Sequence, residues 1–359
     1  MNVLTVNAGS SSLKLSVLDA DDIVLATREA GTDDVGDEIA RLLDETGPVD
    51  AVGHRVVHGG AAHVRPERVT PALVSDLEEL VPLAPLHQPS ALAGIRAVAD
   101  ALPGVPSVAC FDTAFHADLP AAVATYAVPA EWRQRFAVRR YGAHGLSHAY
   151  ASRRAAELVG DRASRVVVAH LGSGASLCAV HDGRSVDTTM GFTPMEGLVM
   201  ATRSGSVDPG LVLWLLTEAG LSADQVADGL DRRGGLLALA GTQDMAAVVD
   251  RAGRGDGPAV LALDVYVHRL VGLVAAMTAT LGGLGVLVFT GGVGERAAEV
   301  RRLTAPRLAH LGVHLDDAAN ADARPDVDVS TAAAAVRTLV VAAREDLEIA
   351  RGTRTVVSG

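Results

Sequence analysis

Short apolar runs rich in β-branched residues alternate with longer segments of helical periodicity along this chain. The clearest run, residues 166–169, stops at a glycine-rich turn over residues 170–176, and a second apolar run then reaches Val180. Apolar runs separated by glycine predict a strand, a turn and a second strand. The N-terminal segment VLTVNAGSSSLKLSVLD has the same pattern. We therefore expect two copies of one hairpin, one in each half of the chain.

The turns of the two predicted hairpins carry small and polar residues at corresponding positions. Asn7, Gly9 and Ser10 of the first turn correspond to His170, Gly172 and Ser173 of the second. Glycine and serine leave backbone N–H groups free to point at one anion, which suits a phosphate. Either turn alone also fits an ordinary hairpin. The pair predicts a phosphate chain held between two similar lobes.

Predicted strands and helices alternate through the rest of the chain. We expect strands in the segment that carries Arg55 and at 105–111, 286–289 and 339–341. We expect helices at about 71–102, interrupted by Pro82, Pro85 and Pro89, and at 258–281, 295–310 and from Glu345 onward. Residues 131–140 and 316–328 are polar and are expected to be irregular. Asp208 before Pro209, and Ser222 with Gln225, are typical helix N-terminal signals. This alternation predicts an α/β fold, and a chain of 359 residues predicts two domains of about 150 residues each.

Composition narrows the classes of partner. A net charge of −12 without a basic stripe argues against nucleic acid. Lys14 is the only lysine. Cys110 and Cys178 lie in apolar strand-like runs, as expected of reduced core residues in a cytoplasmic protein, and no targeting signal is visible at the N-terminus. Residues 270–289 carry no charge and are long enough to span a bilayer, but glycines divide them, so we expect a buried helix and a strand and no membrane association.

Familiar phosphate-binding and hydrolase motifs are absent from the sequence. It contains no GxxxxGK[ST], no HExxH and no GxSxG, and GSGASL is not the dinucleotide fingerprint. His54, His58 and His63 lie close in sequence, but no cysteine or carboxylate joins them at ligand spacing, which argues against a zinc site. Phosphate chemistry therefore depends on the paired turns.

Five side chains are candidates for that chemistry. Arg55 and Arg203 each lie among apolar and small residues, which fits either a structural ion pair or contact with an anion such as a transferring phosphoryl group. Asp112 follows a strand, where it could position Mg²⁺ through water or simply cap a helix or pair with a cation. Glu345 opens a helix, which the helix dipole alone also explains. His144 lies between two glycines and either reaches a reacting group or bonds locally.

These residues belong to a longer series of motifs. NAGSSSLK, GHRVVHGG, PLHQP, FDTAFH, YGAHGLSH, HLGSGAS, DTTMGFTPMEGLVMATRSG, FTGGVGE and EDLEIAR occur in this order over nearly the whole chain. Together they resemble the acetokinase family of the sugar kinase, Hsp70 and actin superfamily. The resemblance implies duplicated actin-like (ribonuclease H-like) lobes with a cleft between them, formed by residues 1–116 with the C-terminal helix 346–359 and by residues 117–345. It also implies reversible phosphoryl transfer between ATP and acetate with Mg²⁺, or Mn²⁺ in its place, in a homodimer.

The resemblance further implies a role for each matching residue. Arg55 and Arg203 would bind the carboxylate and the transferring phosphate, His144 would donate to the same phosphoryl group, and Asp112, Glu345 and Asn7 would position the metal. The nucleotide would contact Lys14, His170, Gly172, Ser173, Gly174, Asp244, Gly291, Gly292, Val293 and Gly294. The acyl methyl would lie among Val57, Leu86, Ala143 and Pro194.

Three positions depart from the family pattern. Ala143 replaces a phenylalanine on the wall of the acyl pocket, so propionate or a longer acid is an alternative to acetate, unless neighbouring side chains fill the space. Ser173 replaces an asparagine in the second phosphate turn. Ala246 replaces an arginine after Asp244, which leaves pyrophosphate or another phosphoryl donor as an alternative to ATP. A sugar kinase would need a catalytic base, and a nucleotide-switched binding module would need a partner domain, so we favour neither.

Overall fold

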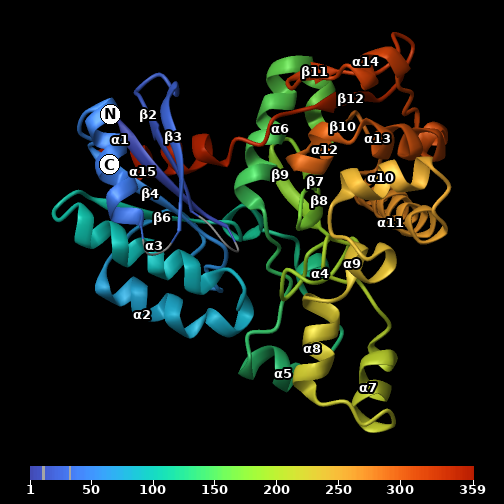
Figure 1. The fold of residues 1–359 in the computed structure, drawn as a ribbon, viewed down its shortest axis with the longest axis horizontal. Coiled ribbons are helices and arrows are strands. Elements are labelled where there is room, and N and C mark those ends of the chain that lie inside the picture. Colours follow the sequence, from blue (N-terminus) through green and yellow to red (C-terminus); the bar gives the residue numbers. More distant parts are fainter. Residues whose placement is uncertain (10–12, 32–33) are drawn as a thin grey trace.

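The computed structural model describes residues 1–9, 13–31 and 34–359, so Ser10 of the first predicted turn lies outside the described residues. Two six-stranded sheets stand side by side (Figure 1). The first sheet has the order β3-β2-β1-β4-β6-β5. Its strands are β1 (Val3–Ala8), β2 (Leu13–Leu18), β3 (Val24–Ala30), β4 (Ala51–Val56), β5 (Glu67–Arg68) and β6 (Ser107–Phe111).

The second sheet has the same topology as the first. Its order is β11-β12-β10-β7-β8-β9. Its strands are β7 (Arg165–Leu171), β8 (Ala175–His181), β9 (Arg184–Thr188), β10 (Val286–Thr290), β11 (Val327–Asp328) and β12 (Arg337–Val340). In each sheet an antiparallel three-strand meander continues into two parallel strands and a short antiparallel edge strand. The predicted pair of hairpins, β1–β2 and β7–β8, is confirmed as part of a larger repeat.

Helices cover the first sheet and bury its apolar runs. One apolar core joins β1, β2 and β4 to the helices α1 and α3. The helical segments of this half are α1 (Val35–Thr46), α2 (Pro71–Glu79), η1 (Val81–Leu83) and α3 (Gln88–Ala101). The predicted interruptions at Pro82 and Pro85 are confirmed. The interruption predicted at Pro89 is wrong, because this proline lies in the first turn of α3, where no intrahelical N–H is needed.

The C-terminal helix, α15 (Glu345–Ser358), returns to this first sheet. Ile349 packs with Val108 and Cys110 of β6. At Gly53 on β4 an added methyl group would lie 2.2 Å from Thr353 Oγ1, so α15 and the sheet are in close contact. Both chain ends lie on this side of the molecule (Figure 1). This packing is compatible with the expected lobe of residues 1–116 and 346–359, although the exact division stays a prediction.

The second sheet is covered by the longest helix of the described chain and its neighbours. α11 (Gly257–Leu281) supplies ten buried residues, which include Ala259, Tyr266 and Leu270, so apolar residues along this helix pack in the core. By length and composition α11 alone could span a membrane among the described residues. The other segments of this half are η2 (Ala114–His116), α6 (Gly145–Val159), η3 (Gly160–Ser164), α9 (Gly235–Ala240), α10 (Met245–Gly253), α12 (Gly291–Arg296), α13 (Ala298–Thr304), η4 (Ala305–Leu311) and α14 (Asp317–Ala321).

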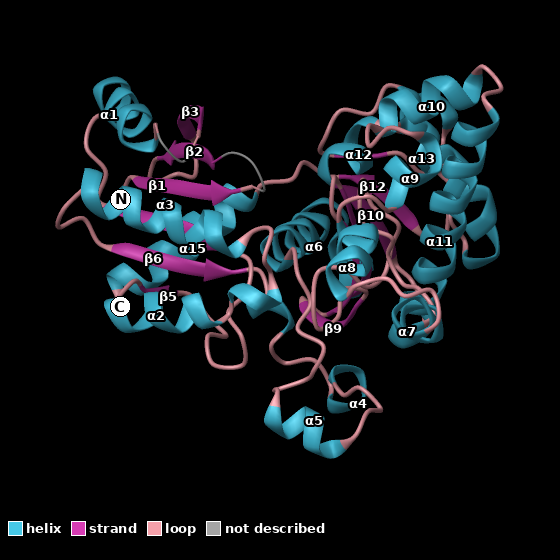
Figure 2. Ribbon diagram, turned by 60° about the horizontal axis from the view of Figure 1, so that its bottom comes forward, coloured by secondary structure: helices cyan, strands magenta, loops and turns pink. Residues whose placement is uncertain are grey.

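Four helices lie apart from both sheets. These are α4 (Ala121–Ala124), α5 (Ala130–Arg135), α7 (Pro209–Thr217) and α8 (Ala223–Asp231), as Figures 1 and 2 show. The predicted caps are confirmed: the Asp208 side chain accepts from the Gly210 N–H, and Ser222 and Gln225 form a complete capping box.

Three predicted segments differ from the structure. The helix expected over 295–310 is divided into α12, α13 and η4, because Ala297 has a non-helical backbone and Pro306 lies in a 3₁₀ turn. The segment 131–140 contains α5, and the segment 316–328 contains α14 and β11. In the last case the Asp316 side chain accepts from the Ala319 N–H and starts a helix that the polar composition concealed.

Candidate functional site

The parallel strands of the first sheet bring three polar side chains to one edge. Asn7 lies near the end of β1, Arg55 near the end of β4, and Asp112 directly after β6. Because these strands are parallel, their carboxyl ends meet at the same edge, where α/β sheets bind ligands. The β1–β2 hairpin also places Lys14 opposite Asn7.

Arg55 is the centre of this group. Its Nε and Nη2 both donate to Asp112 Oδ2, at 3.0 and 2.7 Å, and its Nη1 donates to Asn7 Oδ1 at 3.2 Å. Glu345 Oε2, at the start of α15, lies 3.6 Å from Nη1 and accepts from Asn7 Nδ2 at 2.7 Å. The four side chains therefore hold one another in place at the sheet edge.

Burial and the neighbouring positive charge have opposite effects on the pKa values of the two carboxyl groups, Asp112 and Glu345. Burial raises the pKa of Asp112, although the Arg55 guanidinium opposes this change. Burial also favours the neutral form of Glu345, but Arg55, His170, Asn7 and Lys14 together lower its pKa. Asp112 Oδ1 is buried and has no hydrogen-bond partner among the described residues. An orphaned carboxylate oxygen beside a second carboxylate fits a hydrated Mg²⁺, which usually keeps several of its waters.

The start of α6 brings His144 to this edge. His144 has a left-handed backbone (φ 55°) and is followed by Gly145, whose N–H donates to the Asp112 carbonyl at 3.0 Å. A methyl group at Gly145 would lie 2.0 Å from that carbonyl oxygen, so only glycine allows α6 to begin here. The strained His144 backbone is therefore fixed by contact with β6.

His144 belongs to a buried cluster of imidazoles. Its ring stacks on that of His170 in β7 at a centroid distance of 4.4 Å, and His148 lies one helical turn along α6. Burial lowers the pKa of all three, to about 4 for His170, and the charge of Arg55 adds to the effect on His144 and His170. All three imidazoles are therefore neutral at pH 7.

Arg203 approaches the same place from the loop that follows β9. A methyl group at Gly174, in the β7–β8 turn, would lie 2.6 Å from Arg203 Nη2 and 3.3 Å from His144 Nε2, so both groups converge on this turn. Arg203 Nη1 donates to the Pro194 carbonyl. Within the described ranges no carboxylate lies at ion-pair distance from Arg203, and burial lowers its pKa. A buried cation without an anionic partner is costly unless a ligand supplies the anion.

The two arginines share two neighbours, one of which the sequence analysis missed. Burial lowers the pKa of His87 to about 4, and the charges of Arg203 and Arg55 both add to this effect. The same two charges act on His144. Arg55 and Arg203 therefore both lie near His87 and near His144. His87 lies within the PLHQP motif, but nothing in its local spacing distinguishes it from a capping residue of α3.

The residues expected around the acyl group are dispersed along loops at this edge. Val57 follows β4 and is buried, and Ala143 is buried directly before His144. Leu86 lies before α3 and is half-buried. Pro194 is connected to Arg203 through its carbonyl. Each therefore lies within two residues of a site residue in sequence or is linked to one by a hydrogen bond.

A small cavity of about 220 Å³ lies between the two sheets' hairpins. It is lined by residues expected to contact the metal and nucleotide phosphates, namely Asn7, Lys14, His170, Gly291, Gly292 and Glu345. Gly291 has φ 78°, and a methyl group there would lie 2.8 Å from the Leu171 carbonyl oxygen, so this turn requires glycine. Gly294 is turned away into the core, where its carbonyl accepts from the buried Arg301.

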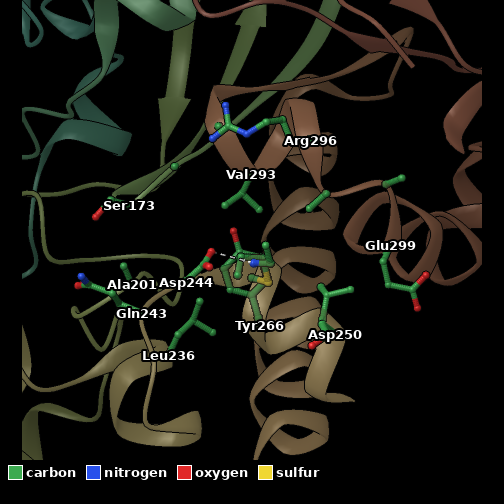
Figure 3. A pocket seen from close by; sticks show the side chains of 17 residues that line it. Ser173, Ala201, Leu236, Gln243, Asp244, Asp250, Tyr266, Val293, Arg296 and Glu299 are labelled. Carbon is green, nitrogen blue, oxygen red and sulfur yellow. Dashed lines mark hydrogen bonds between the residues drawn. The ribbon is translucent and has the colours of Figure 1, made fainter. Parts of the chain in front are cut away.

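A larger pocket of about 520 Å³ adjoins this cavity at Gly292. Of the residues expected to bind nucleotide, it contains Gly172, Ser173, Asp244, Gly292 and Val293. Figure 3 shows Leu236 of α9, Tyr266 of α11 and Val293 of α12 around its interior. The Asp244 carboxylate caps α10 by accepting from the Ala246 N–H at 3.0 Å. Sequence analysis missed Leu236, Met245 and Tyr266, because helical apolar residues give no sign of which cavity they face.

Tyr266 is the most informative of the missed residues. Its side chain is 3% exposed, and its hydroxyl has no hydrogen-bond partner among the described residues. Buried tyrosine hydroxyls usually find a partner. An unpartnered hydroxyl on the wall of a pocket is therefore available to a bound ligand.

The three histidines considered for zinc do not form a metal site. No group of three or more metal-binding side chains is found in the described part of the chain. His54 and His58 are buried, with pKa values lowered by burial to about 3 and about 4, and His63 is within hydrogen-bond distance of Glu67, at 3.2 Å.

Comparisons of sequence and of fold with known proteins point to the same family. The sequence matches the description "Acetokinase family" over residues 25–351. It is 44% identical to an acetate kinase of Leifsonia xyli, with 97% of each chain covered. The fold is similar to the crystal structures of a Porphyromonas gingivalis acetate kinase (TM-score 0.90) and a Francisella tularensis propionate kinase (TM-score 0.92), each 34% identical with 99% of both chains covered.

Proposed function

The chain belongs to the acetokinase family, and from this premise we propose that it transfers the γ-phosphoryl group of ATP reversibly to acetate, giving ADP and acetyl phosphate. The observation that carries the assignment is that Arg203 and His144 converge on the β7–β8 turn at Gly174, while Arg55 lies near the same imidazole. Two guanidinium groups around one site suit a carboxylate and a phosphoryl group, both of which accept bidentate hydrogen bonds.

This geometry supports direct transfer without a general base. A carboxylate is already ionised at neutral pH, so its oxygen can attack the γ-phosphorus without losing a proton. Catalysis then consists of alignment and of stabilising charge on the equatorial oxygens. Arg203 is the arginine more available to a substrate anion, because Arg55 is already paired with Asp112, whereas the described residues offer the Arg203 guanidinium a carbonyl and no carboxylate. His144, which is neutral, would donate through Nε2 to the same phosphoryl group.

The residues present fit Mg²⁺. We propose that Asp112, Glu345 and Asn7 hold it through water, which would satisfy the unpartnered Asp112 Oδ1. When bound, Mg²⁺ neutralises charge on the donor phosphates. The only lysine, Lys14, lines the same cavity and would contact a phosphate oxygen.

The large pocket favours a nucleotide over pyrophosphate as the donor. Pyrophosphate needs only the small polar cavity, whereas Leu236, Val293 and Tyr266 form an apolar compartment beside the phosphate turns. Such a compartment suits a base and ribose. Ala246 lines this pocket where the family pattern has an arginine, so no cation at this position can contact the base. Recognition of the base would then depend on the shape of the pocket and on the Tyr266 hydroxyl.

A homodimer is supported by the surface of α7. Leu211, Leu213, Trp214 and Leu216 are all more than one third exposed on this one helix, and α7 buries no residue in the chain. Apolar patches of this kind mark protein interfaces. We propose that α7 packs against a second copy of the chain, and that Trp214→Lys shifts the mass measured by light scattering from dimer to monomer.

Trapping of the acyl phosphate with hydroxylamine tests the proposed reaction. The purified chain is given acetate, propionate or butyrate with Mg²⁺ and either ATP or pyrophosphate. We expect the highest kcat/KM with acetate and ATP. A preference for propionate or butyrate would identify Ala143 as an enlarged wall of the acyl pocket, and a preference for pyrophosphate would refute the nucleotide assignment.

A further inference from the structure

The hydroxyl of Ser176 joins two imidazoles of the site. Ser176 Oγ lies 2.9 Å from His144 Nδ1 and 2.7 Å from His148 Nε2. Ser176 is fully buried on β8, opposite His170 in the hairpin. His144 directly precedes α6 and His148 lies in its first turn, where the His148 N–H donates to the His144 carbonyl. Both rings therefore reach the Ser176 hydroxyl from the start of one helix.

A count of protons decides the direction of these bonds. A serine hydroxyl carries one proton and can donate to only one of the two nitrogens. His148 Nδ1 is buried and has no partner within the described residues. A buried N–H without an acceptor is rarer than a buried lone pair without a donor, so the His148 proton belongs on Nε2. His148 Nε2–H then donates to Ser176 Oγ, and the Ser176 hydroxyl donates to His144 Nδ1.

We propose that Ser176 and His148 are positioning residues that hold His144 as the tautomer with its proton on Nε2. His144 Nε2 is the atom that faces Gly174 and the Arg203 guanidinium. In this tautomer the neutral ring presents an N–H, and not a lone pair, to an anion bound at the turn. The opposite tautomer would direct a lone pair at a phosphoryl oxygen and repel it. This inference rests on the proposed role of His144 in binding the phosphoryl group.

A second serine repeats the arrangement at the neighbouring ring. Ser147 Oγ lies 2.7 Å from His170 Nδ1, and His170 Nε2 lies 3.6 Å from the position of a methyl group at Gly172. Each imidazole of the stacked pair therefore has a buried hydroxyl at Nδ1 and a glycine of the β7–β8 turn near Nε2. The hairpin supplies Ser176 from its second strand because β8 pairs with β7 in a register that sets Ser176 across from His170.

The tautomer can be measured by ¹⁵N NMR of the histidine-labelled protein without substrates. The His144 signals are identified by their loss in His144→Asn. We expect the wild-type ring to show a protonated Nε2 and a bare Nδ1, and Ser176→Ala to show a mixture of both tautomers. A wild-type His144 protonated on Nδ1 would overturn the proposal.

Kinetics of paired variants test the relay itself. Glutamine at position 148 keeps an N–H donor near the place of Nε2, whereas leucine removes it. We expect His148→Leu and Ser176→Ala each to lower kcat about tenfold with little change in KM, and His148→Gln to stay within about twofold of wild type. Equal losses in His148→Leu and His148→Gln, with unchanged thermal midpoints, would show that packing alone matters and would refute the relay.

A double substitution separates this proposal from the proposed role of His144. In the His144→Ala background, Ser176→Ala should cause no further fall in kcat if the serine acts through that ring. A further fall would contradict the relay. If the tautomer is as proposed but His144→Ala itself has wild-type kcat, the role of His144 in phosphoryl transfer fails while the hydrogen-bond assignment stands.

Discussion

Gly174→Ala is the sharpest test of the site geometry. The glycine lies in the β7–β8 turn, and its backbone is not in the left-handed region, so alanine can adopt the same conformation. Its added methyl group would lie 2.6 Å from Arg203 Nη2, whereas an ordinary contact begins near 3.4 Å. The guanidinium must therefore move by about 0.8 Å, and its bond to the Pro194 carbonyl opposes this movement.

The expected loss follows from that displacement. Misplacing a catalytic group by about 1 Å can reduce the rate about 100-fold, which corresponds to about 2.7 kcal/mol of transition-state stabilisation. We expect Gly174→Ala to lower kcat/KM in the hydroxylamine assay by this amount. The free energy of unfolding in urea should change by less than about 1 kcal/mol, because the added methyl group displaces the end of the Arg203 side chain and not the backbone.

Gly229→Ala provides the matched control. Gly229 lies in α8, where an added methyl group has no neighbour within 4 Å. It should leave kcat/KM unchanged and stabilise the fold by about 0.5–1 kcal/mol. If Gly174→Ala has kcat/KM within threefold of wild type and an unchanged urea midpoint, Arg203 does not act from the position described.

Three further predictions follow from the same contacts. Arg203→Ala should lower kcat by about 10²–10³, and Arg203→Lys should recover little of it, because an ammonium cannot reproduce the guanidinium fork; wild-type turnover in a folded Arg203→Ala protein would remove the assignment. Tyr266→Phe should raise the KM for ATP about three- to tenfold with kcat unchanged, and an unaltered KM would show that the hydroxyl does not meet the nucleotide. Burial lowers the pKa of His54 to about 3 and of His116 to about 4, so the unfolded chain binds more protons below pH 6.5. The free energy of unfolding should thus be constant above pH 7 and fall by up to about 1.4 kcal/mol per pH unit for each ring as the pH drops toward 4; urea titrations that superimpose from pH 7 to pH 5 would contradict this burial effect.

Arg55 and Arg203 show what a local residue pattern can predict and what it cannot. In the sequence both lie among small and apolar neighbours, and both fit either an ion pair or an anion contact. In the structure Arg55 is paired with Asp112, while Arg203 donates to the Pro194 carbonyl and meets no carboxylate among the residues that the structure describes. The difference depends on Asp112, which is 57 positions away from Arg55 in the chain. Local composition contains no information about such partners, because strand register and sheet order bring them together.

The sequence by itself determined the features that depend on near neighbours. Apolar runs separated by glycine-rich turns predicted both hairpins, and the position of Asp112 after a strand predicted its place at the sheet edge. Ser222 with Gln225 predicted a helix start, since a capping box needs only residues three apart. Family motifs added the expected roles of these residues.

Only the tertiary structure decided which distant groups meet. It placed Ser176 between His144 and His148 and brought His87 near both arginines. It also directed Tyr266 of α11 toward the pocket and left Gly294 outside the pocket lining, where its carbonyl binds Arg301. These relations arise when two sheets and their covering helices pack together, and packing selects among faces and registers that are equally compatible with the local sequence.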